Sequence, residues 1–557
     1  MRRLRPLLAS VIALAACTSN EKAATSSAGE AGGTLIIPTS GDASDLFPPF
    51  VGEAVGRAIQ DMVFDRLAEI DTTLTTVGDK TFTPHIARSW TWAPDSLSIA
   101  FSIDPRARWH DGKPVLASDI RYTFNVFNDP KVGSPVAPTL TNLDSVTVRD
   151  SLTAVVWFKR HTPEQFYDVA YQLVIIPEHV YGSIPVEQLH TSELTRNPIG
   201  SGRFRFVKWE AGKRIELIAD TANYRGRAKL DRVIFVPSDP ATAVAQILNG
   251  QADFMEAFLI DQASKLDSNT FARPIVIPLL GHVFLSMNRF APKSKTTPHP
   301  IFSDLRVRRA LSMGVDRESM LRNVFGNVGR LAHGPFAMNA SYADSSLHAP
   351  PFDTVAAKAM LDSSGWRAGA DGFRKKNGRP LRFTLTVSSS PTRRRYSVLL
   401  QEQFRKLGAQ VDINQIDGQP PYLALRAAGD FDAMMDGFSP DPSPSGIKQS
   451  WSTSGIGKAG QNALLYSNPK VDAELDSVGT AFTPLMMRQH ASRAFRQIID
   501  DAPAIWLYDM VVVNAASRRI NVTGMRSDGW WANIADWTIP PDKRIDRDRI
   551  GLATPKS

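Results

Sequence analysis

Segments with the hydrophobic spacing of strands alternate with segments spaced like helices along nearly the whole chain. Residues 96–103 alternate apolar and polar side chains, as expected for a strand with one buried face. Residues 305–313 and 354–364 place apolar side chains three and four positions apart, which indicates helices. Because the two patterns interleave and do not form separate blocks, they predict an α/β protein whose lobes are built on mixed sheets.

The same patterns give the other predicted elements. Further strands are expected at residues 33–38, 214–219, 233–236, 283–287, 382–387 and 410–416. Further helices are expected at residues 54–70, 118–127, 241–249, 396–407, 471–481 and 485–500. We find no internal repeat, and after the first residues no apolar run has the length of a membrane-spanning helix.

Cysteine usage limits how such lobes are held together. Cys17 is the only cysteine among 557 residues, so no disulfide can form within one chain. Hydrophobic residues make up 43% of the sequence, and a chain of this length can form roughly three or four domain-sized units. We therefore expect its stability to come from large apolar cores.

The first residues have the features of an export signal. Three arginines within residues 1–5 precede a short apolar stretch at residues 7–16, which is too short to span a bilayer. Small residues stand directly before Cys17, as in the lipobox of bacterial lipoproteins. We predict that residues 1–16 are a signal peptide and that acylated Cys17 anchors the protein to a membrane. An ordinary signal peptide followed by an incidental cysteine is the alternative.

Residues 17–33 are rich in Ser, Ala, Gly and Glu, a composition too polar to form a core, so we expect a flexible tether. The formal net charge of +8 could suggest nucleic acid as a partner. We exclude this partner because the basic residues are dispersed, some of them lie in the signal, and export separates the protein from nucleic acid.

Four separated segments resemble one protein family. PHIARSW at 84–90 resembles the pattern P-x-L-A-x-S-W, and WHDGKP with ASDI at 109–120 resembles W-H-D-G-x-P-x-x-A-x-D-V. NPIGSGRF at 197–204 is similar to N-P-V-G-T-G-P-Y, and FSDLRVRRAL at 302–311 is similar to F-x-D-x-R-V-R-x-A-L. The four occur in the order and at the spacing of the bacterial extracellular solute-binding proteins of family 5, which serve dipeptide, oligopeptide and nickel importers.

This resemblance implies a two-lobed clamshell, the type II, cluster C fold of periplasmic binding proteins, with an extra subdomain on the first lobe. It also implies a division of the chain. The first lobe would comprise residues 34–60, 195–275 and 505–548, the extra subdomain 61–194, the second lobe 276–504, and a short tail 549–557. The ligand would be enclosed between the lobes when they close about a hinge.

The segment at 431–444, FDAMMDGFSPDPSP, resembles the family pattern F-D-x-x-x-x-G-W-x-x-D-x-x-x-P, with Phe438 at the aromatic position and Asp441 at the aspartate. In peptide-binding relatives this aspartate receives the α-ammonium group of the ligand, because a desolvated cation requires a paired anion. Asp441 could instead only cap a Pro-rich turn. Pro444 comes one residue early for the pattern, so the loop can differ in length.

Dipeptide-binding relatives also place an arginine after a strand of the second lobe to bind the ligand carboxylate. Residues 387–390 contain none, and the next arginine is Arg393, so we expect peptides longer than dipeptides. Large side chains with a polar group are further candidates for the walls of the ligand cleft, although ordinary core packing explains each of them equally well. They are Trp451, Trp530, Trp531, Tyr422 and Asn462.

Enzyme motifs are absent. We find no G-x-S-x-G, H-E-x-x-H or phosphate-loop sequence, and the G-x-G-x-x-G at 455–460 lacks the strand and helix that a dinucleotide site needs. We therefore expect a monomeric binding protein without cofactor or metal, which delivers its solute to an ABC permease and its ATPase. Three other functions stay open: binding of a sugar, nickel chelate or haem, a receptor or scaffold role without import, and a secreted hydrolase.

Overall fold

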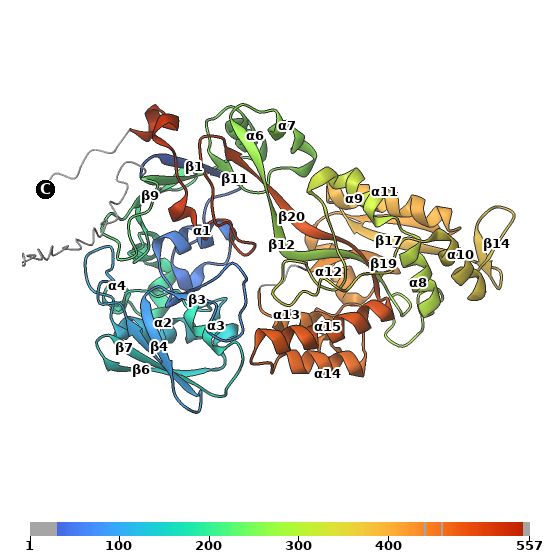
Figure 1. Cartoon of the computed structure of the whole chain (residues 1–557), viewed down its shortest axis with the longest axis horizontal. Coiled ribbons are helices and arrows are strands. Elements are labelled where there is room, and N and C mark those ends of the chain that lie inside the picture. The colour runs from blue at the N-terminus through green and yellow to red at the C-terminus, as the bar shows by residue number, and fades with distance from the viewer. Residues whose placement is uncertain (1–30, 439–441, 458–460, 550–557) are drawn as a thin grey trace, which may run out of the picture.

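The computed structural model describes residues 31–438, 442–457 and 461–549. Figure 1 shows two lobes, which are joined where two long strands cross from one to the other. These are β12 (Ala272–Met287) and β20 (Ala504–Ser517), which pair antiparallel along most of their length. The pairing slips between Pro278 and His282 and again between Val283 and Phe284, so the two strands are irregular where they cross.

The first lobe contains a sheet of strand order β1-β10-β9-β8. Its strands are β1 (Thr34–Thr39), β8 (Phe204–Glu210), β9 (Arg214–Ala219) and β10 (Arg232–Pro237). β1 runs parallel to β10, and the other pairs are antiparallel. Two helices accompany this sheet, α1 (Ala54–Val63) and α6 (Pro240–Leu248). The buried faces of β1, β9 and β10 contribute Leu35, Leu217 and Phe235 to one apolar core.

The extra subdomain has its own antiparallel sheet, with strand order β4-β5-β7-β6. The strands are β4 (Ala87–Trp92), β5 (Ser98–Ile103), β6 (Leu143–Asp150) and β7 (Thr153–Phe158). A small hairpin leads into it, formed by β2 (Ala68–Ile70) and β3 (Phe82–Pro84). Its helices are α2 (Ala117–Asn128), α3 (Gln165–Ala170), α4 (Glu178–Tyr181) and α5 (Glu193–Arg196).

The second lobe is built on the sheet that includes the crossing strands, in the order β11-β20-β12-β19-β17-β18, with β13 paired to β20. Its further strands are β13 (Arg330–Leu331), β17 (Arg382–Ser388), β18 (Gln410–Ile416) and β19 (Ala433–Phe438). The short β11 (Phe254–Met255) pairs with the end of β20 that lies in the first lobe. A separate three-stranded sheet is formed by β14 (Arg367–Ala368), β15 (Arg374–Lys376) and β16 (Arg379–Pro380).

Helices surround the second lobe's sheet (Figure 1). They are α8 (Leu305–Met313), α9 (Arg317–Phe325), α10 (Thr354–Ser363), α11 (Pro391–Lys406), α12 (Gln419–Ala428), α13 (Ser445–Trp451), α14 (Pro469–Val478) and α15 (Pro484–Asp501). The short α7 (Ser264–Asp267) precedes β12. No helix within the described ranges is long and apolar enough to cross a membrane.

The extra subdomain also contacts the second lobe directly, through residues that do not belong to the crossing strands. The hydroxyl of Ser443 donates to the carboxylate of Glu164 at 2.9 Å. The ring of His161 lies against that of Phe482, with centroids 4.2 Å apart. The lobes are therefore connected both by β12 and β20 and by this second contact.

The interleaved α/β architecture expected from the sequence is confirmed, and β9, β18 and α8 have the predicted bounds. The prediction of a helix over residues 54–70 is wrong beyond Val63, where α1 ends. Phe64 has extended backbone, and residues 68–70 pair with β3 because that pairing buries Ala68 and Ile70. Tertiary pairing therefore overrides the helical spacing.

Candidate functional site

A cavity of about 420 Å³ lies between the lobes, beside the crossing strands. Both lobes, the extra subdomain and β12 supply its walls. The lining residues are Arg57, Asp61, Arg66, Tyr167, Tyr171, Gln172, Leu279, Leu280, Pro442, Ser527, Asp528 and Trp531. Its lining is mostly polar and charged, with Leu279, Leu280 and Pro442 as the aliphatic part, so a ligand here would meet hydrogen-bonding and charged groups on most sides.

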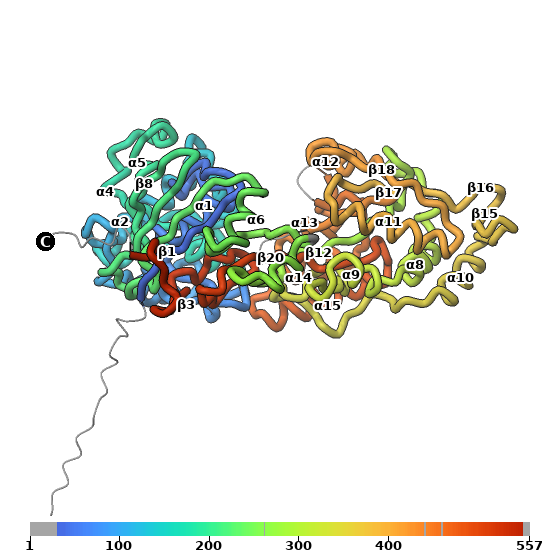
Figure 2. The backbone as a smooth tube through the Cα atoms, turned by 90° about the horizontal axis from the view of Figure 1, so that it is seen from above, coloured from blue at the N-terminus to red at the C-terminus, as the bar shows by residue number. Residues whose placement is uncertain are grey.

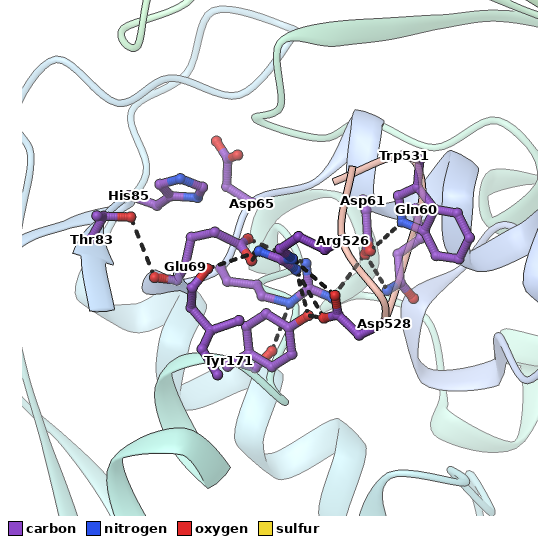
Figure 3. Close-up of polar contacts among 12 residues, drawn as sticks. Gln60, Asp61, Asp65, Glu69, Thr83, His85, Tyr171, Arg526, Asp528 and Trp531 are labelled. Carbon is purple, nitrogen blue, oxygen red and sulfur yellow. Dashed lines mark hydrogen bonds and ion pairs between the residues drawn. The ribbon is translucent and has the colours of Figure 1, made fainter. Parts of the chain in front are cut away.

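The first-lobe side of this cavity is a network of ion pairs (Figure 3). The guanidinium of Arg66 donates to the carboxylate of Asp61 at 2.8 Å and to the backbone carbonyl of Tyr171 at 2.7 Å. The guanidinium of Arg526 donates to Glu69 at 2.7 Å and to Asp528 at 2.9 Å. These segments are distant in sequence, so the network joins the start of the extra subdomain to the C-terminal part of the chain.

Tyr171 and Trp531 complete the network. The Tyr171 hydroxyl donates to Asp528 at 2.8 Å, and burial together with the charges of Asp528 and Glu69 raises the pKa of this phenol well above its usual value. The phenol therefore keeps its proton. The indole N–H of Trp531 donates to Asp61 at 2.8 Å. Because the side chains of this network are partners of one another, they are held in place before any ligand binds.

Arg57 differs from its neighbours in the cavity wall. It precedes Asp61 by one helical turn on α1, so both side chains lie on the same face of the helix. The Arg57 side chain is exposed, and among the described residues no carboxylate lies within ion-pair distance of it. Its charge acts on Glu256, whose pKa it lowers against the larger raising effect of burial. Arg57 is thus available to an incoming anion.

Comparison with known proteins identifies the family. Residues 81–458 match the family described as bacterial extracellular solute-binding proteins, family 5 Middle. The chain belongs to this family. Members are the solute-binding components of ABC transporters and act outside the cytoplasm, so the predictions of a binding protein and against an enzyme are confirmed.

Similar proteins cover almost the whole chain. The oligopeptide-binding protein AppA of Bacillus subtilis (strain 168) is 27% identical over 519 residues, 91% of this chain and 92% of that protein. The solved structure of AppA from Bacillus subtilis in complex with a nonapeptide is 23% identical, with a TM-score of 0.67 over 92% of this chain and 99% of that one. NikZ from Campylobacter jejuni in complex with Ni(L-His) is 21% identical, with a TM-score of 0.68 over 91% and 99%.

These similarities confirm the predicted fold, the two-lobed cluster C fold of this family. The seven ligand-binding residues proposed from the sequence do not all lie at the interlobe cavity. Asp441 lies outside the described residues, as does Cys17. Pro442, which directly follows Asp441, lines the interlobe cavity. Trp531 lines it too, and Trp530 lines a separate pocket of the first lobe.

The other four candidates belong to the interior of the second lobe, and none is among the residues that line the interlobe cavity. Phe438 ends β19 and packs against Trp451, with ring centroids 5.9 Å apart. The hydroxyl of Tyr422 donates to the backbone carbonyl of Met435, and the amide of Asn462 donates to the carbonyls of Ser452 and Tyr466 at 2.9 and 2.7 Å. The polar groups of Tyr422 and Asn462 thus hydrogen-bond to the backbone of the second lobe itself.

Sequence reasoning missed most of the wall. Arg57, Asp61 and Arg66 belong to no family-like motif, and Asp528 looks like an ordinary loop aspartate. A weak signal was present in Tyr167 and Tyr171. They stand four positions apart, and their rings stack with centroids 5.3 Å apart.

Proposed function

We propose that this protein captures peptides longer than dipeptides between its lobes and delivers them to the permease of an ABC importer. The observation that carries the proposal is the interlobe cavity, which is lined from both lobes in a chain of the peptide and nickel family. AppA of Bacillus subtilis, which aligns with 91% of this chain, is an oligopeptide-binding protein. Closure of the lobes would bury the ligand and present a surface that the permease recognises.

Two features of the sequence complete the proposal. Asp441 would bind the α-ammonium group of the peptide, since it precedes Pro442 in the cavity wall and matches the family position. Acylated Cys17 would hold the protein at the membrane surface, within reach of the permease. Residues 17–33 would then be long enough to let the lobes move relative to that anchor.

The test is native mass spectrometry of the signal-free protein purified from its host, followed by denaturation and sequencing of what is released. We expect a mixture of peptides. Asp441→Asn should weaken the binding of a recovered peptide about 30-fold or more, because a buried ammonium loses its anion. Asp417→Asn, at an exposed aspartate of the same lobe, is the matched control and should bind like the wild type.

A released sugar or metal complex would keep the fold and overturn the peptide assignment. Peptides that bind equally well to Asp441→Asn would keep the peptide assignment and remove Asp441 from the site. The lipid anchor is tested separately, on the full-length chain. Mass spectrometry of the N-terminal peptide reads the modification of Cys17 directly: we expect acyl groups on this residue, and an unmodified Cys17 would exclude the lipid anchor.

A further inference from the structure

A second cavity, of about 270 Å³, lies in the first lobe next to the interlobe cavity. We call it the α1–α6 pocket, because both helices supply residues to its lining. Figure 2 shows α1 and α6 near each other in the first lobe. Most of its lining is apolar, including Ile37, Ala54, Val55, Val244, Met255 and Trp530. The pocket is open to solvent at Ala54 and Leu259, so a side chain from outside can enter it.

The α1–α6 pocket shares two walls with the interlobe cavity. Helix α1 lines the pocket with Ala54 and lines the interlobe cavity with Arg57. The pair Trp530–Trp531 does the same from the C-terminal segment, with Trp530 in the pocket and Trp531 in the cavity. The two indole rings are 5.6 Å apart and almost perpendicular, at 88°. The two spaces are therefore neighbours, separated by α1 and the tryptophan pair.

The pocket also has the position at which α/β sheets bind ligands. β1 and β10 run parallel, and Thr39 and Ser238, at or just beyond their carboxyl ends, line the pocket. Ligands of open α/β sheets bind in the crevice outside these strand ends. Leu259 at the rim is 46% exposed, and Ala257 beside it has a φ of +54°, which is rare for a residue with a side chain. Such backbone strain is common at ligand sites.

We infer that the α1–α6 pocket receives a bulky apolar side chain of the bound peptide, so that this protein selects peptides that carry an aromatic or large aliphatic residue at one position. The inference rests on the proposed function and adds the substrate class. The pocket is large enough for one aromatic ring, and its apolar walls leave a charged side chain unsolvated. Glu256 also lines the pocket, and its side chain is exposed, so it would face the peptide backbone or solvent.

The experiment incubates the signal-free protein with a mixed library of four- to nine-residue peptides and quantifies the bound peptides by mass spectrometry. For the wild type we expect Phe, Tyr, Trp, Leu and Met to be enriched at one position. Ala54→Trp and Val244→Phe fill the pocket from two different helices. Each should abolish the enrichment and weaken the best apolar peptide about 10- to 100-fold, while alanine-rich peptides bind as before.

Ala245→Trp is the control, because this exposed position lies on the same helix as Val244 but does not line the pocket. Thermal unfolding verifies that all variants are folded. Enrichment that persists in both filled variants, or bound wild-type peptides without any apolar preference, would overturn the inference and leave the proposed function intact. If the wild type retains no peptide at all, the proposed function fails, and the inference fails with it.

Discussion

The two sides of the interlobe region are stabilised by different forces. On the first-lobe side, Arg66 and Arg526 connect several carboxylates in a network of charged hydrogen bonds. Behind the second-lobe side, His282, Phe284, Phe438, Trp451 and Trp506 pack as a cluster of rings, with Phe284 within 5.7 Å of each of the other four centroids. One side depends on charge pairing and the other on shape, so they should respond to different perturbations.

The largest expected effect is the loss of Arg526. Its side chain is 7% exposed and pairs with Glu69 and Asp528. Without it, half-buried Asp528 would lose its countercharge, and Glu69 would keep only the longer contact with Arg66, at 3.9 Å. We expect Arg526→Ala to lower the free energy of unfolding by about 3–5 kcal/mol, as measured by urea denaturation. Arg382→Ala removes an exposed ion pair with Asp412 and should have no measurable effect. Equal losses in both variants would contradict a special role for the network.

A pH titration tests the aromatic side. Burial lowers the pKa of His282 from 6.5 to about 3, so the folded protein keeps this ring neutral while the unfolded chain protonates it below about pH 6.5. The stability that depends on neutral His282 is therefore fully present above pH 6.5 and is lost as the pH falls. Between pH 7 and 5 the wild type should lose about 2 kcal/mol through this residue, and His282→Phe should not.

Asp509 also contributes to the pH dependence of stability, so its contribution must be the same in the two proteins that are compared. It pairs with His282 across β12 and β20, and burial raises its pKa to about 7, so it destabilises the folded state as the pH rises from about 4 to 7. Wild type and His282→Phe both retain Asp509, so their difference isolates the histidine. His161→Phe, at an exposed histidine, is the control. A difference between wild type and His282→Phe that does not change with pH would show that His282 is already solvated.

The smallest effect is expected from a change at Trp531, which lines the interlobe cavity and hydrogen-bonds to the ion-pair network. Trp531→Phe keeps an aromatic wall but removes the hydrogen bond to Asp61. We expect a loss of about 1 kcal/mol in unfolding free energy and a few-fold weaker peptide binding, measured by urea denaturation and calorimetry. Trp157→Phe is the control, because that exposed indole also donates one hydrogen bond, to Thr147. Unchanged peptide binding by Trp531→Phe would remove this indole from the ligand site.

The sequence predicted regular elements well where one face of the element is buried. β9 alternates buried and less buried residues, and α8 has one apolar stripe with an aspartate cap, Asp304, so their periods are visible in the chain. β20 was missed. Its first six residues, Ala504–Asp509, are all buried, so no alternation distinguishes such a strand from a buried helix. The first half of β12 was missed too, where Pro274 and Pro278 interrupt the pattern.

By itself the sequence determined the family, the α/β class, the absence of intrachain disulfides and the motifs that place the chain among solute-binding proteins, because these depend on local patterns and residue types. The domain limits, the roles of Asp441 and Cys17, and the nature of the solute stay predictions. Only the tertiary structure decided what faces the cavity. Asp61 meets Trp531 across 470 positions, and Tyr422 and Trp451 lie inside the second lobe, because chain crossings bring together residues that no local pattern relates.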